Sequence, residues 1–181
     1  ATIDGTLLFP SAVDMTQTPQ VITTIPAKPQ KTDKPVAQLY VMSFCPYGIQ
    51  AETAMKPVVD LLGTKADINI RFIASVQGNT TDSVQSLHGA TEAQEDLRQV
   101  CIMNYYNQAT YWKYLMYIDN SCYGKIDTRD ATALDACWKS AATNAGIDIA
   151  KIQTCSNSTE GLNLLKSDEQ LTSQYGVSGS P

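Results

Sequence analysis

A single cysteine stands where a strand is expected to end and a helix to begin. Cys45 follows an apolar run and precedes Pro46, which suits a first helical turn because its missing N–H needs no partner there. That turn offers unpaired backbone N–H groups and the positive end of the helix dipole, and both favour a thiolate over a thiol. Because the thiolate attacks disulfides, Cys45 is a candidate redox nucleophile. The alternative is an inert, half-buried cysteine at a strand end.

The residues around Cys45 predict a strand, a helix and a second strand. Residues 36–44 (VAQLYVMSF) are few and rich in β-forming side chains, as in a buried strand. Apolar side chains at helical spacing predict a helix over 47–62, which Pro57 should kink and Gly63 should end. Residues 66–75 alternate apolar and polar side chains and predict a second strand. Two strands joined by a helix are expected to pair in parallel.

The next part of the chain carries helical patterns. After a loop over 76–89, apolar side chains recur at helical spacing through 91–116, with Asn107 as a candidate break. Further helices are expected at residues 130–144, 148–156, 160–166 and 168–174. The aromatic residues within 105–117 are expected to pack in the core, with a peptide-binding face as the alternative.

Composition predicts one globular domain at residues 37–181, preceded by an extended tether at 1–36. Five of the eight prolines fall within the tether, whose polar composition can bury little surface. Only Thr6–Pro10 is a candidate strand there. No apolar run reaches the roughly 18 residues of a membrane span, so a membrane would be reached only through an N-terminal anchor. The net charge of −5 and the scattered basic residues exclude a nucleic-acid footprint.

Five cysteines are many for a reduced cytosolic domain of 181 residues, and their number is odd. The candidates for two structural disulfides, which would leave Cys45 free, are Cys101, Cys122, Cys137 and Cys155. Four cysteines allow three pairings, and the sequence cannot choose among them. Disulfides indicate an extracytoplasmic protein of the periplasm, the cell surface or the secreted class; the alternative is five buried thiols. With no Cys-x-x-Cys pair and one histidine, neither a metal nor a cofactor is predicted.

Two motifs carry a resemblance to a known superfamily. Residues 43–48 (SFCPYG) resemble the active-site turn of thioredoxin-fold thiol–disulfide oxidoreductases, where Cys-x-x-Cys lies between a strand and a helix. Residues 175–181 (YGVSGSP) resemble the loop that carries a cis-proline opposite the active cysteine. The resemblance implies a thioredoxin-like α/β fold with a helical insertion at about 85–166, similar to bacterial periplasmic disulfide oxidoreductases. It also implies that Ser180 and Pro181 hold an extended substrate through main-chain hydrogen bonds.

Two departures from the superfamily limit what the resemblance implies. Gly48 occupies the place of the second, resolving cysteine, so the turn Cys45–Pro46–Tyr47–Gly48 is expected to work as a monothiol. Glutathione, a partner reductase or another cysteine of the chain would then release the mixed disulfide. The superfamily fold also continues with two strands after its cis-proline. The C-terminal strands are therefore expected to be missing here, and a longer natural chain is expected.

A shorter match concerns the only histidine. Residues 87–92 (LHGATE) resemble part of the His-Gly-x-x-Glu signature of the gamma-interferon-inducible lysosomal thiol reductase family. Ser86 and Ala93 replace the cysteines that flank that signature. From its position alone, His88 is predicted to be a loop residue or the start of a helix, without a catalytic part.

Two functions remain open from the sequence. The first is a monothiol reductase or isomerase that acts on exported proteins through Cys45, with protein or peptide thiols and disulfides as partners. The second is a non-catalytic thioredoxin-fold module for binding or surface assembly, tethered by residues 1–36. A pKa of the Cys45 thiol at or above about 8.5 would argue against the first.

Overall fold

The computed structural model describes residues 33–181, which form one compact unit from Asp33 to Pro181. The tether predicted for residues 1–36 lies almost wholly outside the described part of the chain, and so does the candidate strand Thr6–Pro10. Within residues 33–181, no helix is both long and apolar enough to cross a membrane.

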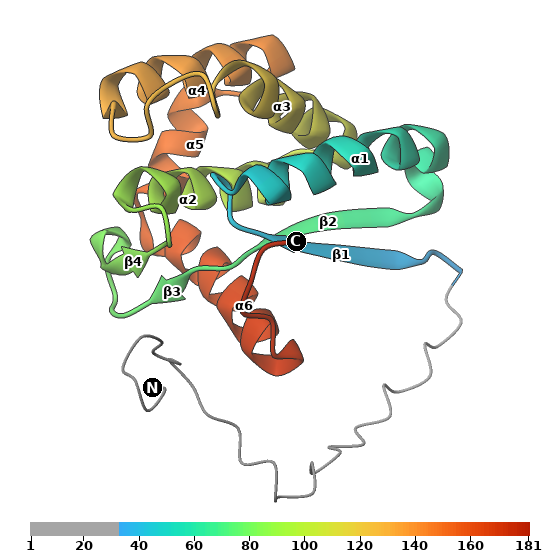
Figure 1. Cartoon of the computed structure of the whole chain (residues 1–181), viewed down its shortest axis with the longest axis horizontal. Coiled ribbons are helices and arrows are strands. Elements are labelled where there is room, and N and C mark those ends of the chain that lie inside the picture. The colour runs from blue at the N-terminus through green and yellow to red at the C-terminus, as the bar shows by residue number, and fades with distance from the viewer. Residues whose placement is uncertain (1–32) are drawn as a thin grey trace, which may run out of the picture. The chain divides into compact units, whose positions relative to one another are not determined.

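A strand–helix–strand unit forms the first part of the fold, as predicted. Strands β1 (Val36–Val41) and β2 (Asp67–Phe72) pair in parallel, and helix α1 (Pro46–Leu62) connects them (Figure 1). The first strand is shorter than the predicted 36–44, because the backbone turns where the Cys45 N–H donates to the Met42 carbonyl at 3.0 Å. The strand is also only partly buried, and Val36 is largely exposed.

A small hairpin follows where a loop was expected. Strands β3 (Ser75–Val76) and β4 (Val84–Gln85) pair antiparallel across a 3₁₀ turn, Thr81–Ser83. A second 3₁₀ turn, Gly63–Lys65, ends α1. These two-residue strands are too short to produce an alternating pattern in the sequence.

Five helices complete the unit: α2 (Ala90–Tyr105), α3 (Gln108–Ser121), α4 (Ala131–Ala145), α5 (Ile149–Ser156) and α6 (Thr159–Tyr175). Asn107 separates α2 from α3 as predicted, because its side chain accepts the Thr110 N–H at 2.9 Å and caps α3. The two short helices predicted at 160–166 and 168–174 are one helix, α6. Ser167 between them continues the helix, and its hydroxyl donates a hydrogen bond to the Asn163 carbonyl oxygen.

The helices pack around a common core with the parallel strands. Three of the aromatic side chains within 105–117 are buried there, Tyr111, Trp112 and Tyr114. Helix α1 lies on one side of the strands and α6 on the other (Figure 1). Buried Asp168 of α6 accepts the Phe72 N–H at 3.1 Å and pairs with Arg71 at 2.9 Å, which fixes α6 to β2.

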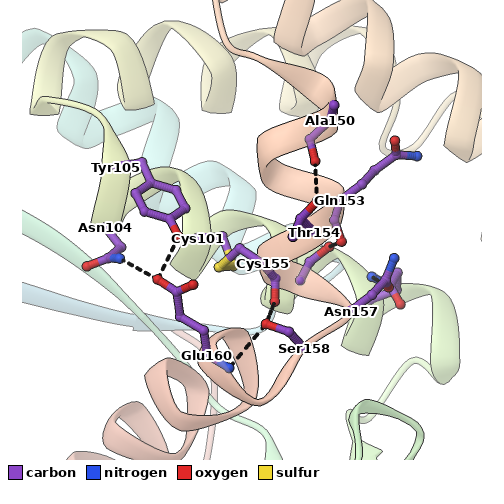
Figure 2. The surroundings of a disulfide bond; sticks show 12 residues. Cys101, Asn104, Tyr105, Ala150, Gln153, Thr154, Cys155, Asn157, Ser158 and Glu160 are labelled. Carbon is purple, nitrogen blue, oxygen red and sulfur yellow. Dashed lines mark hydrogen bonds between the residues drawn. A yellow bond between two sulfur atoms is a disulfide. The ribbon is translucent and has the colours of Figure 1, made fainter.

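Two disulfides join the helices and leave Cys45 as the free cysteine. Cys101–Cys155 links α2 to α5 (Figure 2), and Cys122–Cys137 links the end of α3 to α4. Close packing surrounds the first of them, because a Cβ on Gly161 would lie 2.6 Å from the Cys155 carbonyl oxygen. The disulfides therefore hold α2 against α5 and the end of α3 against α4.

Candidate active site

The Cys45 turn joins β1 to α1 within a few residues. Cys45 caps α1, Pro46 occupies its first turn, and the Cys45 carbonyl accepts the Ile49 N–H at 3.0 Å. The cysteine is partly exposed, while Phe44 before it is buried. The thiol is therefore held by a buried backbone and remains accessible to a substrate.

Hydrogen bonds to the sulfur set the protonation of Cys45. Burial alone would raise the pKa of the thiol, but the Gly48 N–H, the Ser180 hydroxyl and the Tyr47 N–H together lower it below its ordinary value. The negative charge of Glu92 opposes them more weakly. A thiolate that accepts such hydrogen bonds is stabilised over the neutral thiol. The Cys45 thiol is thus favoured as a nucleophile.

The C-terminal loop reaches this turn at Gly48. A Cβ on Gly48 would lie 2.9 Å from the Ser180 Oγ and 3.2 Å from the Met42 carbonyl oxygen. Ser180 is held there because its Oγ accepts the Met42 N–H at 3.3 Å. The Ser180 hydroxyl therefore borders the space that the side chain of a second cysteine would need.

The predicted cis peptide before Pro181 is not confirmed, because every peptide bond within residues 33–181 is trans. Pro181 is exposed beside Ser180. Contact of a substrate with Ser180 and Pro181 stays a prediction.

A buried carboxylate of α2 holds the turn from the other side. Glu92 is 0% exposed, and its Oε1 accepts the Phe44 N–H at 2.8 Å. The same oxygen lies 2.8 Å from His88 Nδ1, and Oε2 accepts the His88 N–H at 2.9 Å. His88 lies just before α2, as predicted, but it is bound to the carboxylate that fixes the residue before Cys45.

A second carboxylate, one turn along α2, strengthens this attachment. Buried Asp96 accepts hydrogen bonds from the Ser43 hydroxyl and, at 2.7 Å, from the Ser86 hydroxyl. Burial and the neighbouring Glu92 charge raise the pKa of Asp96 well above its usual range. The two residues before Cys45 are thus each bound by an acid of α2.

A pair of buried carboxyl groups lies under α1. Glu52 of α1 and Asp119 of α3 interact, and burial raises the pKa of both. The pKa of Asp119 rises to about 8, and that of Glu52 lies well above its usual range. At neutral pH the pair therefore retains a proton, which spares the core a double negative charge.

Sequence reasoning missed the role of these acids. In the sequence, Glu92 stands out only as part of a short signature, and neither Asp96 nor Glu52 belongs to a motif. The available signal is the density of acidic residues in the first turns of α2, where Glu92, Glu95 and Asp96 lie within five positions.

Comparison with known proteins decides the family. Residues 36–141, more than half of the chain, match the sequence profile of the gamma interferon inducible lysosomal thiol reductase (GILT) family. The chain belongs to the GILT family. The match extends from β1 into α4 and includes Cys45 and the segment from His88 to Glu92. The short signature thus indicated the family, and the resemblance at the Cys45 turn indicated its thiol chemistry.

A solved structure supports the fold. The chain resembles a proposed protein disulfide isomerase from Nitrosomonas europaea, with a TM-score of 0.57 and 15% identity over 82% of each chain. No curated protein matches this sequence. The fold is a helix-rich, thioredoxin-like α/β fold, and this GILT protein is a thiol–disulfide oxidoreductase that acts on protein disulfides.

Proposed function

We propose that this GILT protein is an extracytoplasmic reductase or isomerase that works with one cysteine, Cys45. The observation that carries the proposal is the free, partly exposed Cys45 thiol, whose pKa is lowered by the N–H groups of its own helix and by Ser180. Gly48 stands at the position of a resolving cysteine, and Ser180 borders the space such a side chain would need. The other four cysteines are engaged in disulfides.

The chemistry proceeds in three exchanges. The Cys45 thiolate attacks one sulfur of a substrate disulfide, the S–S bond breaks, and the second substrate sulfur leaves as a thiolate that takes up a proton. An external thiol, such as glutathione or the thiol of a partner reductase, attacks the Cys45 sulfur and releases the first substrate thiol. A second external thiol then frees Cys45. Overall, one substrate disulfide becomes two thiols, and two external thiols become one disulfide.

His88 is the group we assign to proton transfer in the first exchange. Its Nδ1 binds the Glu92 oxygen that also holds the Phe44 N–H, so the imidazole is fixed beside the turn. A protonated imidazole there supplies a proton to the leaving sulfur, and the carboxylate orients the ring. The sequence alone predicts no catalytic part for His88, and the role proposed here rests on its hydrogen bond to Glu92.

An oxidising compartment suits this arrangement. Cys101, Cys122 and Cys155 are fully buried in their disulfides, where reductants have little access. Structural disulfides of this kind persist outside the cytosol. If residues 1–36 are a tether that ends in a membrane anchor, the domain would lie at a membrane surface. Without an anchor, it would be secreted or periplasmic.

The test is disulfide reduction with glutathione as the external thiol. Insulin reduction is measured for the wild type and for Cys45→Ser, and the intact mass of each protein is recorded after incubation with oxidised glutathione. We expect turnover and one glutathione adduct per chain in the wild type, and neither in Cys45→Ser. Equal activity of the two proteins, or an adduct on another cysteine, would overturn the proposal.

A further inference from the structure

A cavity of about 230 Å³ lies among α2, α3 and α4 and reaches the Cys45 turn. Its walls are mostly apolar and include Phe44, Ile118, Tyr123, Leu134 and Trp138. Phe44 is the residue directly before Cys45, so one wall of the cavity belongs to the turn that carries the thiol.

We propose that this cavity binds a large apolar side chain, preferably aromatic, of the polypeptide whose disulfide Cys45 attacks. The inference rests on the function proposed above and names its substrate class: unfolded or exposed segments with an aromatic residue near the disulfide-bonded cysteine.

The size of the cavity fits such an occupant. An apolar cavity of about 150 Å³ in a protein can bind benzene, so the larger volume here accommodates an aromatic side chain. Two small lining side chains, Ala90 at the start of α2 and Ala131 at the start of α4, are exposed. We call this exposed part of the lining the mouth of the cavity. A side chain can therefore enter from the surface.

The charged groups in the walls are already paired, which favours a neutral occupant. Arg98 pairs with Glu95 at 3.3 Å and lies over the Trp138 ring, 4.7 Å from its centroid. The second Glu95 oxygen accepts the Tyr114 hydroxyl at 2.8 Å. A charged ligand would have to compete with these interactions, whereas an apolar one would not.

The cavity and the thiol share their supporting elements. Thr91, in the first turn of α2, lines the cavity, and Glu92 beside it holds the Phe44 N–H. The walls are fixed by the Cys122–Cys137 disulfide and by the contact of the Phe44 and Tyr123 rings, 4.5 Å between centroids. A rigid, preformed pocket loses little entropy when it binds a side chain.

Two large apolar side chains that are close in sequence to Cys45 and His88 are exposed. Tyr47, two residues after Cys45, is 67% exposed, and Leu87, directly before His88, is 73% exposed. Large apolar side chains this exposed are typical of surfaces that bind other polypeptides. A substrate segment would thus contact Tyr47 or Leu87 while one of its side chains enters the cavity.

The test uses two disulfide-linked peptides that differ only in the residue beside the cysteine, Phe or Ser, and a small disulfide without peptide, bis(2-hydroxyethyl) disulfide. Ala131→Trp places a large side chain at the mouth of the cavity. Ala136→Trp is the matched control, because Ala136 is exposed on the same helix and does not line the cavity.

We expect the wild type to prefer the Phe peptide by about tenfold in kcat/KM, as a hydrophobic pocket typically discriminates. Ala131→Trp should reduce the preference to twofold or less, Ala136→Trp should keep it, and turnover of the small disulfide should be equal in all three. An unchanged preference in Ala131→Trp, or none in the wild type, would overturn the inference. Loss of small-disulfide turnover in Cys45→Ser but not in these variants shows that the proposed function itself holds.

Discussion

The Cys45 turn and the helical region from α2 to α5 use the same element, sulfur, in opposite ways. At the turn, one cysteine is partly exposed and is held by hydrogen bonds from the Gly48 and Tyr47 N–H groups and from Ser180. In the helical region, four cysteines are joined in two disulfides, and three of them are fully buried. All five residues are cysteines, so their location relative to a helix start, rather than residue type, separates the reactive sulfur from the structural ones.

The two regions are connected by the acids of α2. Glu92 and Asp96 bind the backbone or side chain of the two residues before Cys45, and α2 itself is fixed by Cys101–Cys155. The Cys101–Cys155 disulfide and the Cys45 turn are therefore attached to the same helix, α2.

Loss of a disulfide should give the largest change, and it should affect stability more than chemistry. In a chain-entropy model, Cys101–Cys155 closes a loop of 54 residues and contributes about 4 kcal/mol to the free energy of unfolding, whereas Cys122–Cys137 closes 15 and contributes about 3 kcal/mol. Urea unfolding of the two double Cys→Ala variants measures both values. If Cys122–Cys137 contributed more than Cys101–Cys155, loop length would not determine how much each disulfide stabilises the helical region.

Introducing a second cysteine at the turn should lower the stability of the fold. Gly48→Cys brings its Cβ to within 3.2 Å of the Met42 carbonyl oxygen and 2.9 Å of the Ser180 Oγ, so we expect a loss of about 2 kcal/mol in unfolding free energy. Gly179→Ala is the control, because nothing lies within 4 Å of a Cβ there. A Gly48→Cys variant as stable as the control would show that the turn readily accepts a resolving cysteine.

The buried carboxyl pair should make stability depend on pH. Because the folded-state pKa values of Glu52 and Asp119 are raised, the native state retains protons that the unfolded chain has lost. The free energy of unfolding should therefore fall as pH rises from about 4 to about 8. Glu52→Gln should flatten this dependence, whereas Asp82→Asn at an exposed position should not. Parallel pH profiles for both variants would contradict the assignment.

Removal of one hydrogen bond to the sulfur should give the smallest effect. Ser180→Ala leaves the Gly48 and Tyr47 N–H groups in place, so the pKa of Cys45 should rise only in part towards its ordinary value, with the fold unchanged. Ser178→Ala, an exposed residue of the same loop, is the control. Equal pKa values of the Cys45 thiol in the two variants would show that the Ser180 hydroxyl does not stabilise the thiolate.

The parts of the fold that local patterns encode were predictable from the sequence. The parallel strands, α1 and the break at Asn107 follow from side-chain alternation, helical spacing and a capping residue. The family signature at His88 is also recognisable from the sequence alone. Long-range features were not: the Glu92–Phe44 hydrogen bond spans 48 residues, and the cysteine pairing depends on how α2, α3, α4 and α5 pack. Such contacts leave no periodic trace in the chain.

The most direct test of the account is the pKa of the Cys45 thiol. Cys45 is the free cysteine of the chain, so the rate of alkylation by iodoacetamide as a function of pH reports on this sulfur without background. We expect a midpoint clearly below the ordinary thiol value of about 8.5, and a higher midpoint in Ser180→Ala. A midpoint at or above about 8.5 in the wild type would contradict the claim that the turn prepares Cys45 as a nucleophile.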